Sequence, residues 1–179
     1  MRVLVLGGIR SGKSAWAETQ IADSAGSRRP VRYLATGTGD DADWAARVSA
    51  HRDRRPDHWS TVETADVATQ LRSDPDSPTL VDDIGCWLTA AMDRAGAWTG
   101  GTVSADIDDL IDAVAGCETE LVLVSPEVGL TVVPETVTGR RFADELGTLN
   151  RRLAALCERV VLVVAGQPVT VKGPAKGPM

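Results

Sequence analysis

Residues 7–14 read G-G-I-R-S-G-K-S and directly follow the apolar run V-L-V-L at positions 3–6. The pattern G-x-x-x-x-G-K-S is that of a P-loop, which is meaningful when a strand precedes it and a helix follows it. Glycines let the backbone curl so that several N–H groups point at phosphate oxygens. An ordinary glycine-rich turn is the alternative, and the position at the first strand–helix junction argues against it. The stretch therefore predicts a nucleoside triphosphate site.

Each part of this loop has an expected role. Lys13 supplies a positive charge to the β- and γ-phosphates and is a predicted catalytic residue, while the Ser14 hydroxyl is a predicted ligand of Mg²⁺. The helix that starts near Lys13 adds the positive end of its dipole. The predicted nucleotide-binding residues of the loop are Gly7, Gly8, Ile9, Arg10, Ser11, Gly12, Lys13 and Ser14.

The size and composition of the chain limit the classes of protein to which it can belong. With 179 residues, 43% hydrophobic and 25% charged, it is expected to form one domain over residues 1–172, followed by a flexible tail at 173–179. The net charge of −6 and the lack of a basic stripe argue against a nucleic-acid partner. No apolar run is long enough to span a bilayer and no signal peptide is evident, so cytoplasmic residence is expected. The three cysteines lack metal-ligand spacing and are expected to be buried thiols.

Strand-like and helix-like segments alternate along the chain. Continuous Val/Leu runs predict buried parallel strands at 2–6, 31–35, 79–81, 121–125 and 160–164, with further short strands at 59–63 and 169–171. Helices are expected at 13–24, 41–52, 65–72, 86–94, 104–115 and 140–157. The alternation predicts an α/β fold, P-loop NTPase-like, with three layers and a mainly parallel central sheet flanked by helices.

A P-loop needs a carboxylate partner for its metal, and this residue usually follows another apolar strand. Asp82 and Asp83 come directly after the run T-L-V at positions 79–81. Asp82 is the preferred candidate because it is closer to the end of the strand. A pair of helix-capping residues is the alternative interpretation.

Both histidines of the chain lie in the segment R-V-S-A-H-R-D-R-R-P-D-H-W at positions 47–59. Four arginines surround His51, and like charges favour the neutral imidazole, which is a nucleophile. Arginines also bind the phosphates that such a nucleophile attacks. A solvated, charged helix end is the alternative. His58 lies beside Trp59, and we interpret it as structural or half-exposed.

Five segments together resemble one family. They are G-G-I-R-S-G-K-S at 7–14, Y-L-A-T-G at 33–37, A-R-V-S-A-H-R-D-R-R-P-D-H-W at 46–59, E-V-G-L with V-P-E within 127–135, and R-R-F-A-D-E-L-G-T-L-N-R-R-L-A at 140–154. The chain is similar, from residue 1 to about residue 172, to the bifunctional adenosylcobinamide kinase / adenosylcobinamide-phosphate guanylyltransferase family of cobalamin biosynthesis.

The resemblance implies two reactions and a set of residues. Such enzymes phosphorylate adenosylcobinamide with ATP or GTP and then transfer GMP from GTP through a guanylylated histidine, here His51. A homotrimer is also implied. Besides residues 7–14, the implied nucleotide contacts are Thr36, Gly37, Thr38, Arg52, Asp53, Arg54, Arg55, Glu63 and Asp82.

Other interpretations stay open. The chain could carry only one of the two activities, as a small-molecule kinase or a guanylyltransferase. A nucleotide switch is disfavoured because the guanine-reading motif N-K-x-D is absent. Glu127 and Glu135 are candidates for the cobinamide side. Pro126 and Thr131 depart from the Asn and Gly that are common in the family, which puts the substrate loop of the kinase step in doubt.

Overall fold

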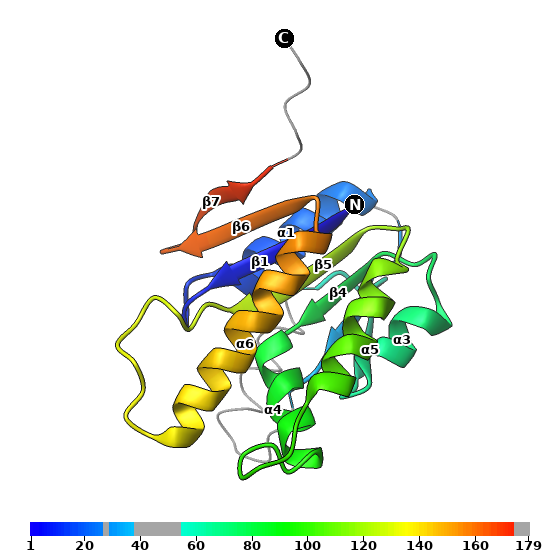
Figure 1. The fold of residues 1–179 in the computed structure, drawn as a ribbon. Coiled ribbons are helices and arrows are strands. Elements are labelled where there is room, and N and C mark those ends of the chain that lie inside the picture. The colour runs from blue at the N-terminus through cyan, green and yellow to red at the C-terminus, as the bar shows by residue number, and fades with distance from the viewer. Residues whose placement is uncertain (27–28, 38–54, 174–179) are drawn as a thin grey trace.

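The structure is a computed structural model, which describes residues 1–26, 29–37 and 55–173. Helices and strands alternate along most of the chain and form one sheet with helices on both faces (Figure 1). Their order is β1 (Arg2–Gly7), α1 (Lys13–Ala25), β2 (Arg32–Ala35), β3 (Ser60–Glu63), α3 (Val67–Ser73), β4 (Thr79–Asp82), α4 (Ile84–Arg94), α5 (Ser104–Ala115), β5 (Leu121–Pro126), α6 (Val137–Leu156), β6 (Arg159–Val164) and β7 (Gln167–Lys172).

The seven-stranded sheet has the order β3-β2-β4-β5-β1-β6-β7. All neighbouring strands are parallel except the pair β6–β7, which is antiparallel. Because parallel strands end at the same edge, the sheet brings the ends of β1, β2, β3 and β4 together. The mainly parallel sheet predicted from the Val/Leu runs is therefore confirmed.

Two apolar clusters hold the helices against the sheet. On one face, Ala17 and Ile21 of α1 pack on side chains of β1, β5 and β6. The larger cluster lies on the other face, under α3, α4, α5 and α6, which are in front of the sheet in Figure 1. Both clusters use alternate residues of the same strands, which is why these strands are apolar throughout rather than alternating.

The predicted strands are all present, and most differences concern where helices begin. The helix expected from residue 86 begins at Ile84, because the Asp83 carboxylate accepts a hydrogen bond from the Cys86 N–H at 2.8 Å. The helix expected from residue 140 begins at Val137, because the Thr136 hydroxyl caps it. In both helices the capping side chain thus sets a start that is earlier than the one the apolar spacing indicates. The helix expected at 41–52 and the tail expected at 173–179, except Gly173, lie outside the described residues.

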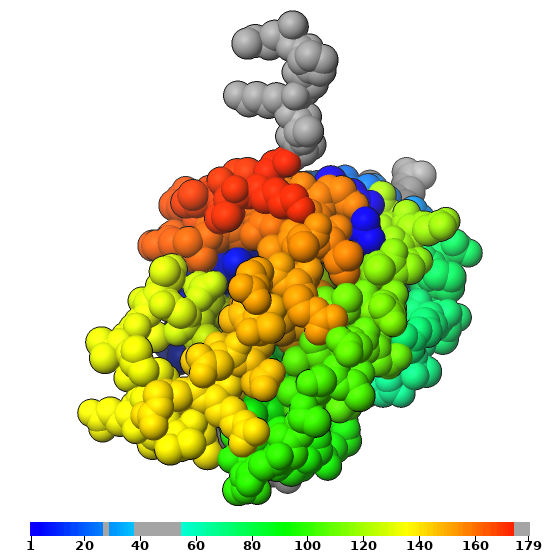
Figure 2. All heavy atoms as spheres, viewed as in Figure 1, coloured from blue at the N-terminus to red at the C-terminus, as the bar shows by residue number. Residues whose placement is uncertain are grey.

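The surface in Figure 2 shows α4, α5 and α6 covering this face, while the segment between β5 and α6 (yellow) projects from one side. That segment carries exposed apolar side chains, among them Leu130, Val132 and Val133. Within the described residues, no helix combines the length and the apolar character needed to cross a membrane.

Asn150 joins α6 to the end of β5. Its side-chain oxygen accepts from the Ser125 hydroxyl at 2.6 Å, and its amide donates to the Pro126 carbonyl at 3.0 Å. Asn150 is 6% exposed and Ser125 is fully buried. A buried polar group that loses its partner costs free energy, so this pair fixes how α6 sits over the strand.

Replacing Asn150 should therefore destabilise the fold. We expect Asn150→Ala to lower the free energy of unfolding by about 1–3 kcal/mol, since Ser125 loses its buried partner. Urea denaturation followed by circular dichroism measures the change. Thr148→Ala, an exposed substitution on the same helix, is the control and should change it by less than about 0.5 kcal/mol. Equal stability of the two variants would contradict this account.

Candidate nucleotide site

Gly7 ends β1 where there is no room for a side chain. A Cβ atom at this position would lie 2.4 Å from Ser11 Oγ and 2.8 Å from the carbonyl oxygen of Val163 on β6. Both distances are far below van der Waals contact. The loop that follows Gly7 therefore begins in direct contact with the sheet, and only glycine permits this approach.

The rest of the loop curls back and is held from the side. Gly12 has a φ of 92° and Arg10 a φ of 57°, both in the left-handed region. The Ser11 N–H donates to the Gly8 carbonyl at 3.3 Å, and the Gly166 N–H, from the turn between β6 and β7, donates to the Ser11 carbonyl at 2.8 Å. Left-handed backbone at Gly12 turns the chain into α1, as the P-loop pattern predicts.

The start of α1 leaves several positive or donor groups available. Gly12 caps the helix without a side-chain hydrogen bond, so the amides of the first turn have no side-chain acceptor. Among the described residues, neither the Lys13 ammonium nor the Ser14 hydroxyl makes a hydrogen bond or an ion pair, and both residues are half-buried. Helix N-termini with free amides bind anions, so this end of α1 suits a phosphate.

The two carboxylates after β4 have different surroundings. Asp83 caps α4, whereas Asp82 Oδ2 accepts a hydrogen bond from the Tyr33 hydroxyl at 2.5 Å. Burial and the Asp82 carboxylate raise the pKa of Tyr33, which keeps its hydroxyl protonated as a donor. Burial, with Asp83 nearby, raises the pKa of the Cys86 thiol to about 12, so this thiol is not a nucleophile at neutral pH. Asp83 is thus used by the helix, and Asp82 remains the candidate.

Glu63 and Asp82 lie in one row across the sheet. Both pair in register with Ala35, which lies between them on β2. Residues paired in register on parallel strands project to the same face, here the face that α1 covers. Two neighbouring strand spacings put their backbones about 10 Å apart. The structure thus brings two of the predicted contacts to the same edge as the P-loop.

Arg55 is directed into the protein. Its guanidinium carbon lies 3.3 Å from the centroid of the Tyr33 ring, and its Nη1 donates to Thr61 Oγ1 at 2.9 Å. Its Nε lies 3.7 Å from Glu18 Oε1, and the Arg55 side chain is 7% exposed. The nucleotide contact expected of Arg55 stays a prediction, and its described contacts are with β2, β3 and α1.

Thr36 and Gly37 follow β2 at the same edge. The Thr36 N–H donates to the Asp82 carbonyl at 3.1 Å, and its hydroxyl donates to the Asp83 carbonyl at 2.5 Å. Thr36 is 1% exposed, and Gly37 is half-buried. Thr36 thus joins the ends of β2 and β4, and its hydroxyl is already used there.

The remaining predicted residues near the arginine-rich segment are placed as follows. His58 is exposed. The predicted site residues that lie outside the described part of the chain are Thr38, His51, Arg52, Asp53 and Arg54.

The loop after β5 adjoins the P-loop. The Glu127 N–H donates to the Gly7 carbonyl at 3.1 Å, and Glu127 Oε1 accepts from the Gly129 N–H at 2.7 Å. Pro126 lies against Gly85 at the start of α4, because a Cβ on Gly85 would be 2.6 Å from Pro126 Cγ. Although Pro126 lacks a backbone donor, the next residue supplies the bond to Gly7. Thr131 and Glu135 are exposed.

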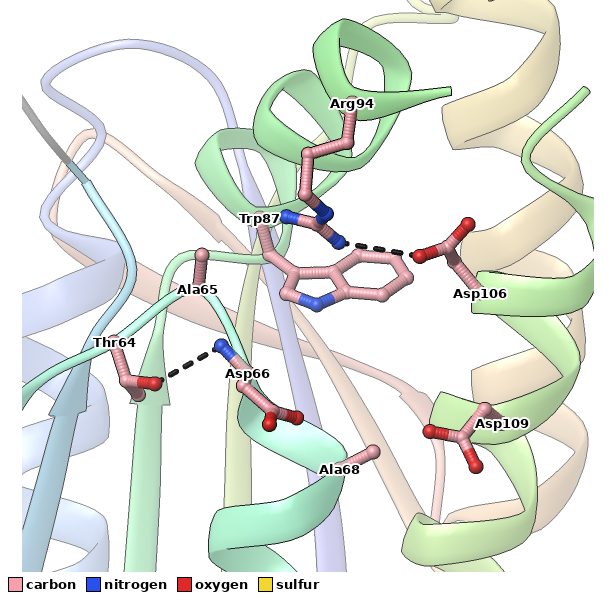
Figure 3. A pocket seen from close by; sticks show the side chains of 8 residues that line it. All are labelled: Thr64, Ala65, Asp66, Ala68, Trp87, Arg94, Asp106 and Asp109. Atoms are coloured by element: carbon pink, nitrogen blue, oxygen red, sulfur yellow. Dashed lines mark hydrogen bonds and ion pairs between the residues drawn. The ribbon is translucent and has the colours of Figure 1, made fainter. Parts of the chain in front are cut away.

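A hollow of about 500 Å³ lies between α3, α4 and α5, on the face of the sheet opposite to α1 (Figure 3). Arg94 reaches across the Trp87 indole to Asp106 at 3.2 Å, and the Asp66 N–H donates to the Thr64 hydroxyl at 2.9 Å. None of the predicted site residues lines it. The lining residues are Thr64, Ala65, Asp66, Ala68, Trp87, Arg94, Asp106 and Asp109.

Comparison with known proteins identifies the family of the chain. A family model described as "Cobinamide kinase / cobinamide phosphate guanyltransferase" matches residues 3–171. The chain belongs to this family. It is 39% identical over 178 residues to a bifunctional adenosylcobalamin biosynthesis protein, CobP, of Pseudomonas aeruginosa, covering 97% of this chain and 98% of that protein. It is 38% identical over 191 residues to CobU of Salmonella typhimurium, another bifunctional adenosylcobalamin biosynthesis protein, covering 96% and 100%.

Solved structures extend the likeness of the fold. An ATPase from the type III secretion system of pathogenic bacteria superposes with a TM-score of 0.59 at 11% identity, covering 94% of this chain and 56% of that chain. A second solved structure, an ATPase domain, superposes with a TM-score of 0.58 at 9% identity, covering 98% of this chain and 78% of that chain. The predicted P-loop NTPase-like fold and the predicted family are both confirmed.

Sequence reasoning missed Tyr33 and Glu18. Tyr33 is the single tyrosine of the chain and stands two residues before Ala35, on the face that Asp82 shares. Because alternate residues of a strand face the same side of the sheet, this two-residue spacing could have predicted that Tyr33 lies on the same face as Asp82. Glu18 has no such signal, because its contact with Arg55 depends on how α1 crosses the sheet.

The close approach at Gly7 predicts a strong effect of adding one methyl group. We expect Gly7→Ala to weaken the binding of a fluorescent GTP analogue at least about tenfold, because the Cβ would displace Ser11 or β6. Equilibrium titration measures this, and circular dichroism checks that the variant is folded.

Gly147→Ala is the matched control, since Gly147 is exposed on α6 and a Cβ there would meet nothing within 4 Å. This variant should bind as the original chain does. Normal binding by the Gly7→Ala variant would show that the loop does not depend on this contact.

Proposed function

We propose that this chain catalyses two successive transfers. It phosphorylates the aminopropanol hydroxyl of adenosylcobinamide with ATP or GTP, and then transfers GMP from GTP to that phosphate with release of pyrophosphate. The observation that carries this proposal is membership of the cobinamide kinase / cobinamide phosphate guanyltransferase family over residues 3–171. The curled loop at residues 7–14 and the available Lys13 and Ser14 support nucleotide binding at the edge of the sheet.

In the first transfer, the substrate hydroxyl oxygen attacks the γ-phosphorus and the bond from that phosphorus to the leaving nucleotide diphosphate breaks. The Lys13 ammonium and the first-turn amides of α1 stabilise the negative charge on the phosphate oxygens. The left-handed Gly12 places these amides at the end of the loop. The work of these groups is to position and neutralise the triphosphate.

Mg²⁺ is the metal that this chemistry implies, and the residues at the edge fit it. A serine hydroxyl and a carboxylate are oxygen ligands of the kind that Mg²⁺ prefers, and it commonly takes only one or two from the protein. The Ser14 hydroxyl has no hydrogen-bond partner among the described residues, and Asp82 ends β4 on the face that α1 covers. Ser14 and Asp82 would hold the ion, which neutralises phosphate charge when bound.

In the second transfer, an imidazole nitrogen of His51 attacks the α-phosphorus of GTP, and the bond to pyrophosphate breaks. A phosphate oxygen of adenosylcobinamide phosphate then attacks the same phosphorus, and the bond to His51 breaks. Splitting one difficult transfer into two steps is the advantage of a covalent intermediate. The proposed nucleotide contacts beyond the loop are Thr36, Gly37, Thr38, Arg52, Asp53, Arg54, Arg55, Glu63 and Asp82.

The loop after β5 is proposed to bind the cobinamide. Glu127 adjoins the P-loop through its backbone bond to Gly7. Leu130 and Val132 are 78% and 87% exposed a few residues later, and a corrinoid is large and largely apolar. Glu135 is exposed on the same loop. These exposed side chains support the loop after β5 as the surface that binds the corrinoid.

Two expectations go with the proposed function. Similarity to the family implies a homotrimer, for which sedimentation velocity is the direct measurement. Cytoplasmic residence also stays a prediction.

The guanylyl intermediate predicts a covalent label. After incubation with α-³²P-GTP and Mg²⁺ and then denaturation, we expect radioactivity on the protein that is labile to acid and stable to base. The His51→Ala variant should lose it to background, because the attacking nitrogen is gone. The control is His58→Ala, which replaces the other histidine of the chain. This variant should keep the label, because His58 is not the proposed nucleophile. A chain without label under turnover conditions would refute the guanylyl step.

The kinase step has its own test. Lys13→Ala should lower the rate of γ-phosphate transfer to adenosylcobinamide about 10²–10³-fold, because one stabilising charge is lost from the transition state. Transfer of ³²P from γ-labelled ATP or GTP to the corrinoid measures it. If phosphate transfer is absent from the unaltered chain while the α-label forms, the protein is a guanylyltransferase alone.

A further inference from the structure

A buried Arg–Tyr pair lies directly behind the carboxylate that the proposed function assigns to the metal. Tyr33 is 2% exposed, and its hydroxyl donates to Asp82 Oδ2 at 2.5 Å. An ionised carboxylate oxygen can only accept a hydrogen bond, so the Tyr33 hydroxyl is the donor. One oxygen of the Asp82 carboxylate is therefore held in place by the end of the Tyr33 ring.

The ring is itself held by Arg55. The guanidinium carbon lies over the ring, 3.3 Å from its centroid. Glu18 of α1 balances the charge at 3.7 Å, and Thr61 of β3 accepts a hydrogen bond at 2.9 Å. The Arg55 and Glu18 side chains are 7% and 12% exposed. Arg55 is therefore enclosed by β2, β3 and α1, and its contacts compensate for the burial of its charge.

The described contacts of Arg55 engage three parts of its guanidinium. The carbon lies over the Tyr33 ring, Nη1 donates to Thr61 Oγ1, and Nε lies near Glu18. These three contacts come from β2, β3 and α1 and fix the side chain to the sheet. Its sequence position, four residues after His51, places this anchor next to the proposed nucleophile along the chain.

We propose that Tyr33 and Arg55 are positioning residues. Tyr33 orients the Asp82 carboxylate, while Arg55 holds the Tyr33 ring and fixes its own position, four residues after His51, to the sheet. The inference rests on the proposed function, because it gives the two transfers a common structural support. Groups that orient a metal-binding carboxylate typically contribute about 10–100-fold in metal affinity or activity.

Two conservative substitutions separate the two contacts. Tyr33→Phe keeps the ring for Arg55 and removes the hydrogen bond to Asp82. Arg55→Lys keeps the positive charge near Glu18 and removes the planar group that covers the ring. Arg72→Lys is the matched control, because Arg72 is an exposed arginine of α3 that pairs with Asp109.

The first readout is equilibrium binding rather than activity. A fluorescent GTP analogue is titrated with Mg²⁺ and again with EDTA. For Tyr33→Phe we expect affinity in EDTA to be unchanged and the gain from Mg²⁺ to fall about tenfold, because Asp82 is no longer oriented. A gain from Mg²⁺ equal to that of the unaltered chain would overturn the role of Tyr33.

The second readout uses the fact that the chain has one tyrosine. Labelling with ¹³Cζ-tyrosine gives a single nuclear magnetic resonance signal, which reports the hydrogen bond and the ring contact of Tyr33. Asp82→Asn and Arg55→Lys should each shift this signal, and Arg72→Lys should not. An unshifted signal in the Arg55→Lys variant would overturn the stacking role.

The α-³²P-GTP label then connects the pair to the second transfer. At limiting Mg²⁺ we expect Tyr33→Phe to label about tenfold more slowly than the unaltered chain, and at saturating Mg²⁺ to label at the same rate. Arg55→Lys should label at least about tenfold more slowly at both Mg²⁺ concentrations. Equal rates for Arg55→Lys and the unaltered chain would refute a role of the Arg55 contacts in the second transfer. If the unaltered chain takes no label, the proposed guanylyl step fails, while Mg²⁺ titration and the tyrosine signal still decide the positioning roles.

Discussion

The parallel pairing of β1 with β5 and β6 is the constraint on which the candidate site depends. Gly7 pairs with Pro126 and with Val163, so β1 is held in register from both sides up to its last residue. Gly7 then leaves the sheet within van der Waals reach of Val163. Because the P-loop starts from a strand fixed on both sides, its left-handed turn and the start of α1 have a defined place relative to β4. The same pairing brings the neighbouring loops to the P-loop, since the Glu127 N–H continues the ladder of β5 to the Gly7 carbonyl.

Buried charged side chains near β2 and β3 have partners of opposite charge. Arg55 pairs with Glu18 and lies over the Tyr33 ring, whose hydroxyl donates to Asp82. A buried charge without such partners would be costly. These contacts join β2, β3, β4 and α1 in one set.

Much of the architecture could be predicted because it depends on local pattern. Val/Leu runs identify buried parallel strands, and the residues of the P-loop identify the first strand–helix junction. Helix starts at Ile84 and Val137 could not be placed from apolar spacing, since the capping bonds of Asp83 and Thr136 decide them. The arginine-rich segment predicted phosphate chemistry from composition, yet composition does not tell which arginine is buried.

The sequence by itself determined the fold class, the family and the loop that is proposed to bind phosphate. These follow from short-range order: the spacing of glycines, the Lys-Ser pair and the run of strands and helices. Only the tertiary structure decided the partners of Asp82, Asp83 and Arg55. Those partners come largely from segments distant along the chain, such as Tyr33 on β2 and Glu18 on α1, and their contacts depend on strand order and on how α1 crosses the sheet.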